Sequence, residues 1–431
     1  MSEISHDMQA GETSQHLHGQ NRIRLIGLFF GVAFLAIAGQ LTKLTLFPKP
    51  DEAKIHIAAE TRMPRPDIVD RNGVLLATDV AVASLFADPS KIIDIDEAIE
   101  LLTATVPDLD AKELRRKLSS KKSFAWLKRQ VSPEERDAVY NLGIPGVSYI
   151  NERRRVYPQG HLSSHVVGYV DLDTKGIAGI EKYLDDQGAL YTASLAQPEE
   201  HRSQPAQMSV DIRVQAAVID ELTQAIAKFR AIAAGGIILD INTGEVISMV
   251  SLPDFDPNNP KEAHDPERIN RLTTGVYEMG STFKALTLAM ALDSGKANLN
   301  TLFDARGALN YGKFAIHDTH PLGRSLSLSE VFTFSSNVGA ARIALAQGVE
   351  AHKAFLRKMG QLDRLRTELP ESTSPIVPKR WGELNTITIA FGHGLSVAPL
   401  QAVMGINAVI NGGYLIPPTF LKRSEEEARA I

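Results

Sequence analysis

Cysteine is absent from this chain of 431 residues. The absence excludes disulfide bridges, catalytic thiols, zinc sites built on cysteine and lipid attachment through a cysteine. It fits an oxidising compartment in which the chain folds without bridges.

A surplus of one charge sign is absent as well. Lys and Arg total 46 and Asp and Glu total 51, which gives a net charge of −5, and no long basic tract occurs. These values exclude a nucleic-acid-binding protein. The hydrophobic share of 44% and the charged share of 23% are those of a globular chain. They exclude a mostly disordered, a collagen-like or a polytopic membrane protein, and the length suggests about three domains.

Long apolar runs are rare, and only one stands out. Residues 25–42 read LIGLFFGVAFLAIAGQLT without a charge. As a helix this run would be about 27 Å long, nearly the thickness of a hydrocarbon core. We therefore expect a transmembrane anchor. A cleaved signal peptide is an alternative, because residues 36–38 (Ala-Ile-Ala) resemble a cleavage site. A buried helix is less favoured, because the run is apolar all round.

A polar, breaker-rich stretch at 199–207 predicts the boundary between two domains. Before it, Asn72-Gly73 separates two apolar runs and predicts a hairpin, and Ser132 is placed to begin a helix. After it, a long helix near 213–230 precedes a strand–turn–strand pattern at 235–250. We expect an elongated β-rich domain followed by a layered α+β or α/β domain.

Ser281 and Lys284 precede an apolar helical pattern that ends at Gly295. A helix beginning near Ser281 places the serine at the positive end of the helix dipole and Lys284 on the same face. A neutral lysine amine there can take the hydroxyl proton and activate the serine as a nucleophile. In isolation, a capping serine with an exposed lysine explains the pair better. The similar Ser119–Lys122 lies in a basic, polar run and is interpreted as a solvated face.

A second motif, Ser335-Ser336-Asn337, lies 54 residues after Ser281. Ser327 and Glu330 predict a capping box for the preceding helix, so the motif falls where one helix gives way to the next. Taken alone, it is explained by an ordinary helix cap. Together, Ser-x-x-Lys and Ser-x-Asn form the constellation of penicillin-interactive serine acyltransferases.

The surrounding sequence resembles the class B penicillin-binding proteins and is most similar to the division-specific (septal) peptidoglycan D,D-transpeptidases. The resemblance covers nearly the whole chain after residue 20. It rests on segments that match the family's signature boxes: 65–73, 155–158, 165–169, 179–183, 239–258 and 391–401.

The resemblance implies a multidomain α+β protein. It predicts a cytoplasmic tail (1–24), a single transmembrane helix (25–46), a β-rich elongated pedestal of the dimerisation type (50–207) and a partial α/β transpeptidase domain (208–431). It implies a single-pass inner-membrane protein with a periplasmic catalytic domain and no cofactor or metal. The implied ligands and partners are peptidoglycan stem peptides, β-lactam antibiotics, a glycan-strand polymerase and other division proteins, with no nucleic acid.

The resemblance also implies roles for four residues. Ser281 would attack the carbonyl between the two D-alanines of a stem peptide, and Lys284 would be the general base. Ser335 would relay a proton to the leaving D-Ala. Asn337 would hydrogen-bond Lys284 and the substrate amide.

Two departures from the family pattern occur. Met279 stands where the family often has proline, and no Lys-Thr-Gly follows Asn337. We therefore expect the catalytic domain to be cut short. An alternative function is a membrane-anchored division scaffold that docks on a glycan polymerase while its catalytic domain is inactive. A β-lactamase or β-lactam sensor is a third interpretation, which the large domain before the catalytic motifs disfavours.

Two further clusters are interpreted as structural. His161 and His165 have a helical spacing that can grip a metal, but no carboxylate pattern accompanies them. Residues 153–155 (Arg-Arg-Arg) are interpreted as a packed or interdomain salt-bridge cluster rather than a lipid site.

Overall fold

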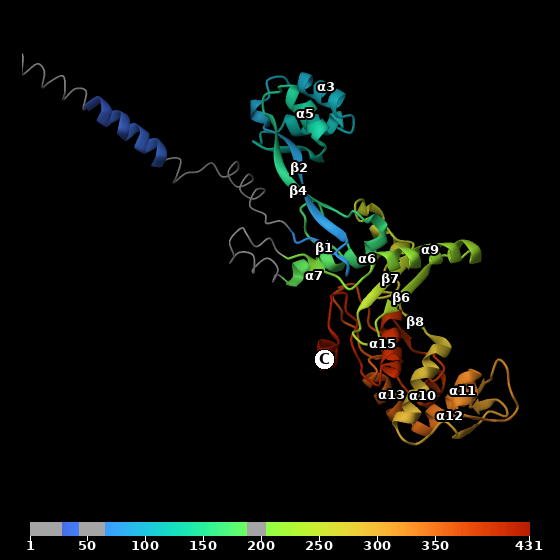
Figure 1. The fold of residues 1–431 in the computed structure, drawn as a ribbon. Coiled ribbons are helices and arrows are strands. Elements are labelled where there is room, and N and C mark those ends of the chain that lie inside the picture. Colours follow the sequence, from blue (N-terminus) through green and yellow to red (C-terminus); the bar gives the residue numbers. More distant parts are fainter. Residues whose placement is uncertain (1–27, 43–64, 188–203) are drawn as a thin grey trace, which may run out of the picture. The chain divides into compact units, whose positions relative to one another are not determined.

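The computed structural model describes residues 28–42, 65–187 and 204–431 (Figure 1). The predicted tail, the ends of the predicted anchor and most of the predicted boundary at 199–207 lie outside these ranges. Residues 28–42 form a helix whose apolar side chains are mostly exposed. A search of the described ranges for a helix with both the length and the apolar character of a membrane span finds none.

The described residues after position 64 divide into two compact units. Unit 1 contains residues 82–152, and unit 2 contains residues 65–81 together with 153–431. Two long strands, β2 (Leu75–Ala87) and β4 (Val147–Val156), contribute residues to both units. Residues 153–187 therefore belong to the same compact unit as the residues that carry the Ser-x-x-Lys motif.

Unit 1 is a sheet covered by short helices. Its elements are β3 (Ala125–Val131), parts of β2 and β4, η1 (Pro89–Lys91), α3 (Ile95–Thr105), α4 (Ala111–Leu118) and α5 (Pro133–Asn141). Leu85 of β2, Leu102 of α3 and Leu127 of β3 are buried in one apolar core. The predicted helix start at Ser132 is confirmed, because Ser132 and Glu135 form a reciprocal capping box.

Unit 2 begins with the predicted hairpin, which is confirmed. β1 (Ile68–Val69) pairs antiparallel with β2, and Gly73 in the turn has a φ of 85° that favours glycine. β1 also pairs in parallel with β5 (Ala206–Gln207). The helices η2 (Gly160–Ser163), α6 (Ser164–Val167) and α7 (Gly179–Gln187) complete this part of the unit.

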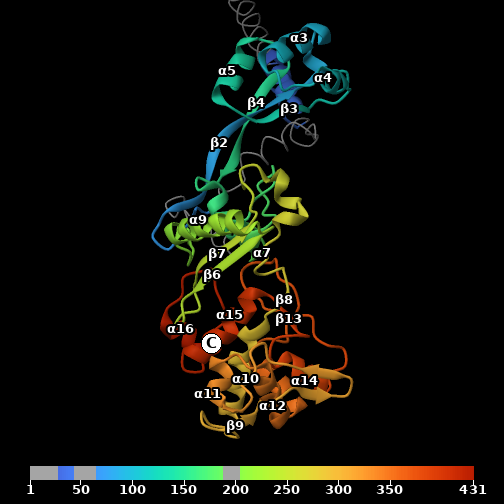
Figure 2. The same cartoon turned by 90° about the vertical axis from the view of Figure 1, so that its right-hand side faces the viewer.

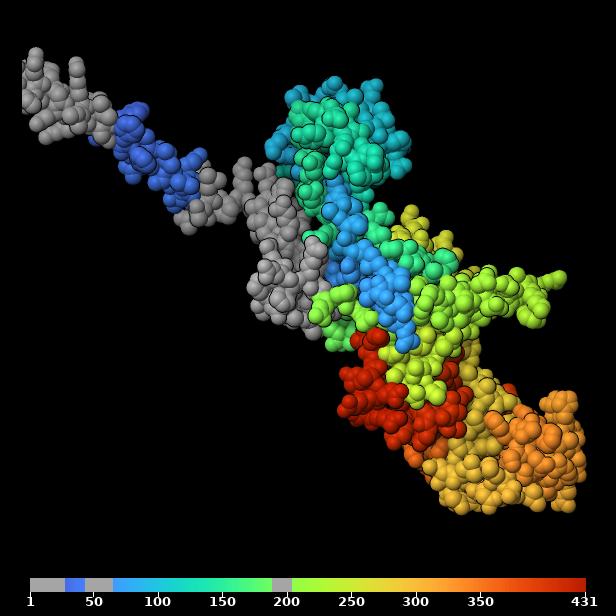
Figure 3. All heavy atoms as spheres, in the orientation of Figure 1, coloured from blue at the N-terminus to red at the C-terminus, as the bar shows by residue number. Residues whose placement is uncertain are grey.

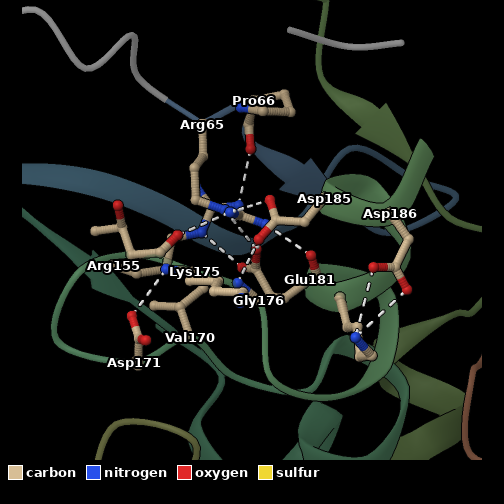
Figure 4. Close-up of polar contacts among 12 residues, drawn as sticks. Arg65, Pro66, Arg155, Val170, Asp171, Lys175, Gly176, Glu181, Asp185 and Asp186 are labelled. Carbon is tan, nitrogen blue, oxygen red and sulfur yellow. Dashed lines mark hydrogen bonds and ion pairs between the residues drawn. The ribbon is translucent and has the colours of Figure 1, made fainter. Parts of the chain in front are cut away.

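A buried ion cluster joins α7 to the strands beside it (Figure 4). Glu181 is fully buried and accepts from Arg65 at 2.8 Å and from Arg155 at 2.6 Å. Arg65 also contacts Asp185, and Arg155 contacts Asp79 at 3.1 Å. Arg155 is thus a packed salt-bridge residue. Each buried charge is paired, which is the condition under which burial of charge is tolerated.

We expect Glu181→Ala to lower the free energy of unfolding by about 3–5 kcal/mol, because it leaves two buried guanidinium groups without their shared carboxylate. Urea denaturation followed by circular dichroism measures the change. Asp186→Ala on the same helix is the matched control, since its pair with Lys182 is exposed and such pairs contribute about 0–1 kcal/mol. Equal effects of the two substitutions would contradict the prediction.

The remainder of unit 2 opens with a helix on a hairpin. The predicted long helix is α9 (Ile212–Phe229), and it begins at the capping residue Asp211. The predicted strand–turn–strand is β6 (Ala234–Leu239) paired antiparallel with β7 (Val246–Leu252). α9 packs on this hairpin (Figure 2), and Val218 and Leu222 lie close enough to Gly236 to crowd any side chain there. Both predictions are confirmed.

A helical region follows, and its atoms run from yellow through orange to red in Figure 3. Its helices are η3 (Pro260–His264), η4 (Pro266–Arg268), η5 (Gly280–Phe283), α10 (Lys284–Asp293), α11 (Leu328–Thr333), α12 (Asn337–Gln347), α13 (Val349–Lys358), α14 (Glu383–Ile389), α15 (Pro399–Ile410) and α16 (Glu425–Ala430). Its short strands are β8 (Tyr277–Glu278), β9 (Leu302–Asp304), β10 (Leu309–Tyr311), β11 (Phe314–Ile316), β12 (Ser325–Ser327) and β13 (Ser396–Val397). Met290, Val338 and Ile387 place α10, α12 and α14 around one buried core.

Candidate active site

Ser281 lies in the first turn of a helix that runs through η5 into α10. Gly280 precedes it with a φ of 55°, a conformation that glycine adopts without strain. Phe283 and Leu286 are buried and anchor the helix, whereas Ser281 itself is exposed. The backbone N–H groups of a first helical turn have no partner within the helix. The hydroxyl and the N–H of Ser281 are therefore presented together.

Lys284 is 1% exposed and lies at the centre of the predicted residues. Its Nζ is 3.2 Å from Ser281 Oγ, 2.9 Å from Ser335 Oγ and 2.7 Å from Asn337 Oδ1. It also contacts the backbone carbonyl oxygen of Ser335. The structure thus brings together four residues that are up to 56 positions apart in the chain.

Burial lowers the pKa of Lys284 to about 8, against a smaller opposing effect from the negative charge of Asp318. Desolvation disfavours the ammonium form, so an appreciable fraction of the amine is neutral near pH 8. Two of its four neighbours, the carbonyl oxygens of Ser335 and Asn337, can only accept hydrogen bonds. A neutral amine has two N–H groups for these two acceptors, and its lone pair is left for a hydroxyl proton.

The turn at Ser335 is held in an uncommon conformation. Ser335 has a φ of 52°, and the residue that caps α12 is Ser336, whose Oγ accepts from Gly339 N–H at 2.9 Å. The positive φ turns the Ser335 side chain and carbonyl toward Lys284 rather than into the helix cap. A non-glycine residue in this region is unusual and is often found at functional sites.

Asp318 anchors this turn, although no sequence motif points to it. Its carboxylate accepts from Ser336 Oγ at 2.7 Å and from Val338 N–H at 2.9 Å. The neighbouring carbonyl of His317 accepts from Asn337 Nδ2 at 3.1 Å. Asp318 lies 18 residues before Ser336 in a loop without a helical or strand pattern, so local sequence carried no signal for the contact.

Gly392 contacts the backbone of Gly280, the residue that precedes the nucleophile. Gly280 N–H donates to the Gly392 carbonyl at 3.1 Å, and a Cβ on Gly392 would lie 1.9 Å from the Gly280 oxygen. The strand pair β13–β8 continues the contact through Ser396 and Glu278. Position 392 therefore requires glycine, because its backbone lies too close to that of Gly280 for a side chain to fit.

The other sequence candidates do not join this cluster. Ser119 ends α4 in unit 1, and Lys122 is exposed. His161 pairs with Asp254 at 3.0 Å, and His165 Nε2 meets the Arg268 carbonyl at 2.8 Å. These two histidines thus have separate partners, and a search of the described residues finds no group suited to hold a metal ion.

Known proteins show what this arrangement is similar to. Residues 234–430 match the model of the penicillin binding protein transpeptidase domain, and residues 60–187 match that of the penicillin-binding protein dimerisation domain. The chain is 36% identical, over 421 residues, to the probable peptidoglycan D,D-transpeptidase FtsI of Caulobacter vibrioides. It belongs to the penicillin-binding transpeptidase family. The resemblance stated from the sequence motifs is thereby confirmed.

Two further relatives of this penicillin-binding transpeptidase agree. It is 32% identical over 382 residues to the probable peptidoglycan D,D-transpeptidase PenA of Neisseria gonorrhoeae, and 32% identical over 364 residues to the peptidoglycan D,D-transpeptidase FtsI of Escherichia coli. The matches cover 97%, 84% and 78% of this chain and 70%, 65% and 60% of the Caulobacter, Neisseria and Escherichia proteins. The predicted multidomain α+β class with a dimerisation and a transpeptidase region is confirmed.

Proposed function

We propose that this protein is a septal peptidoglycan D,D-transpeptidase that cross-links stem peptides through a serine acyl-enzyme and is a target of penicillin. The observation that carries the proposal is the placement of the buried Lys284 amine between the Ser281 hydroxyl and two carbonyl acceptors. The relatives named FtsI support the septal role.

The contacts around Lys284 suggest the order of proton transfers. The neutral amine accepts the Ser281 proton while Oγ attacks the carbonyl between the two D-alanines. The N–H of Ser281 stabilises the developing oxyanion. The C–N bond then breaks, and the proton passes from Lys284 through Ser335 Oγ to the leaving D-Ala amine. An amine from a second stem attacks the ester, releases Ser281 with its proton, and forms the cross-link.

The lifetime of the acyl-enzyme distinguishes a transpeptidase from a β-lactamase. We expect benzylpenicillin to add its mass to the protein and to remain attached for many minutes, as intact-protein mass spectrometry would show. Release of D-Ala from a stem pentapeptide in the presence of an acceptor amine tests the natural reaction. Rapid release of penicilloate would instead support the β-lactamase interpretation.

A second candidate function is that of a scaffold that docks on a glycan polymerase and other division proteins without catalysis, and the match of residues 60–187 to a dimerisation domain supports it. We expect the 431-residue chain to be acylated by penicillin about 10²–10³-fold more slowly than a chain extended through a Lys-Thr-Gly segment, because the family resemblance implies a second oxyanion donor just after that motif. Labelling both chains with a fluorescent penicillin and quenching the reaction at a series of times measures the ratio of the two acylation rates. Equal rates would show that the motif is dispensable.

We also propose that residues 25–46 anchor the protein in the inner membrane, with residues 1–24 cytoplasmic and both the pedestal (50–207) and the transpeptidase domain (208–431) periplasmic. The uncharged run at 25–42 supports this proposal. We expect the protein to remain in the membrane fraction after carbonate extraction and to keep its N-terminus. A mature N-terminus near Gly39 would establish cleavage instead.

A further inference from the structure

The carboxylate of Glu278, three residues before the nucleophile, links its own segment to the segment at 392–394. Glu278 Oε1 accepts from Gly394 N–H at 2.7 Å, and Glu278 Oε2 lies 3.0 Å from His393 Nδ1. The Gly394 N–H first and His393 second lower the pKa of Glu278, so its carboxylate is ionised and can only accept. His393 Nδ1 is therefore the donor in this contact.

The same two loops meet at the backbone beside Ser281. The Gly280–Gly392 hydrogen bond and the Glu278 contacts lie within four residues of each other on both segments. The Gly280–Gly392 hydrogen bond holds the Met279–Gly280 peptide, and the carbonyl of the following Gly280–Ser281 peptide lies against Gly392. The Glu278 carboxylate opposes separation of the two loops. The orientation of this peptide sets the direction of the Ser281 N–H.

The exposure of the pair argues against a role in global stability. The side chains of His393 and Glu278 are 58% and 46% exposed. Exposed ion pairs of this kind contribute little to folding. Because they lie beside the nucleophile, their loss can instead shift the reacting groups, and a misplacement of these groups by about 1 Å can lower the rate about 10²-fold.

We propose that Glu278 and His393 are positioning residues that clamp the Gly280–Ser281 peptide against the Gly392–Gly394 turn and so aim the Ser281 N–H at the oxyanion. The inference rests on the proposed function, because it assigns a consequence to that reaction. The proposed clamp depends on the hydrogen bonds of residue 278 and not on its charge. A glutamine at position 278 keeps an acceptor for the Gly394 N–H and a partner for His393, so we expect it to preserve the clamp.

The experiment compares acylation by benzylpenicillin in the full chain and four variants. We expect Glu278→Ala to lower the second-order acylation rate by about 10–100-fold and His393→Ala by less, with unchanged thermal unfolding midpoints. Glu278→Gln should stay within about 3-fold of the parent. His161→Ala is the matched control, because the 55% exposed side chain of His161 pairs with a carboxylate, that of Asp254, at the same distance of 3.0 Å, and neither residue belongs to the loops beside Ser281.

A second measurement separates this inference from the proposed function. Hydrogen–deuterium exchange of the peptide covering 277–283 should increase in Glu278→Ala and not in Glu278→Gln or His161→Ala. If Glu278→Ala is acylated at the rate of the parent protein, or if its hydrogen–deuterium exchange at 277–283 is unchanged, the clamp proposal is wrong. If the parent protein is not acylated at all, the proposed function fails, and the exchange result alone decides the inference in the same two directions.

Discussion

Ser281→Ala is expected to abolish covalent labelling by a fluorescent penicillin. The substitution removes the hydroxyl that we propose as the acylated group, and the other serine hydroxyl beside Lys284, that of Ser335, is proposed as a proton relay rather than as a nucleophile. Because Ser281 is exposed and makes its side-chain contact only with Lys284 among the described residues, the fold should survive. Gel fluorescence after a fixed labelling time measures the loss, and circular dichroism confirms the fold.

Ser119→Ala is the matched control for this prediction. Ser119 and Lys122 repeat the same spacing, but Ser119 ends α4 in unit 1 and Lys122 is exposed. This variant should label like the parent protein. Persistent labelling of Ser281→Ala, or loss of labelling in Ser119→Ala, would show that the nucleophile has been assigned wrongly.

The candidate site divides into a part that the sequence predicts and a part that it does not. The Ser281–Lys284 spacing is local, because three residues along a helix face bring two side chains together. Ser335 and Asn337 were found as a motif whose distance from Ser281 in the chain says nothing about their distance in space. Their meeting at Lys284 depends on the packing of α10 against α12.

The contacts that support the site were beyond sequence reasoning for a physical reason. Asp318 holds the Ser335 turn, and Gly392 receives the Gly280 backbone, through tertiary hydrogen bonds between segments without periodic patterns. The positive φ of Ser335 is also set by its surroundings, since serine has no intrinsic preference for it. Composition and periodicity record which face is buried, but they do not record such pairings.

Residues 65–187 likewise combine features that the sequence predicts with features that it does not. The hairpin at Asn72-Gly73 and the helix start at Ser132 follow from local turn and capping chemistry and are confirmed. The contacts of Arg155 with Glu181 and Asp79 join residues 26 and 76 positions apart. A run of three arginines indicated an ion cluster, but strand alternation does not identify its buried member, because it places Arg153 and Arg155 on the same face of β4. Arg155 alone of the three is buried, where Glu181 and Asp79 pair with it.

Lys284→Ala is expected to slow penicillin acylation by about 10²–10⁴-fold, the range that a positioned general base contributes. Lys284→Arg is the informative companion variant. Arginine keeps a positive charge and hydrogen-bond donors but cannot be deprotonated in a protein, so it should not restore the rate. Recovery in Lys284→Arg would mean that the lysine acts through its charge rather than as a base.

The pH dependence of acylation provides the independent check on the same residue. Burial lowers the pKa of Lys284 to about 8, and the active form is the neutral amine. The rate should therefore rise about tenfold per pH unit below pH 8 and level off above it, because the neutral fraction grows in that manner. Lys284→Ala should lose this rise while remaining folded. A flat profile between pH 6 and 9 in the parent protein would contradict the assignment of Lys284 as the base, since the neutral fraction of an amine with a pKa of about 8 rises steeply across that window.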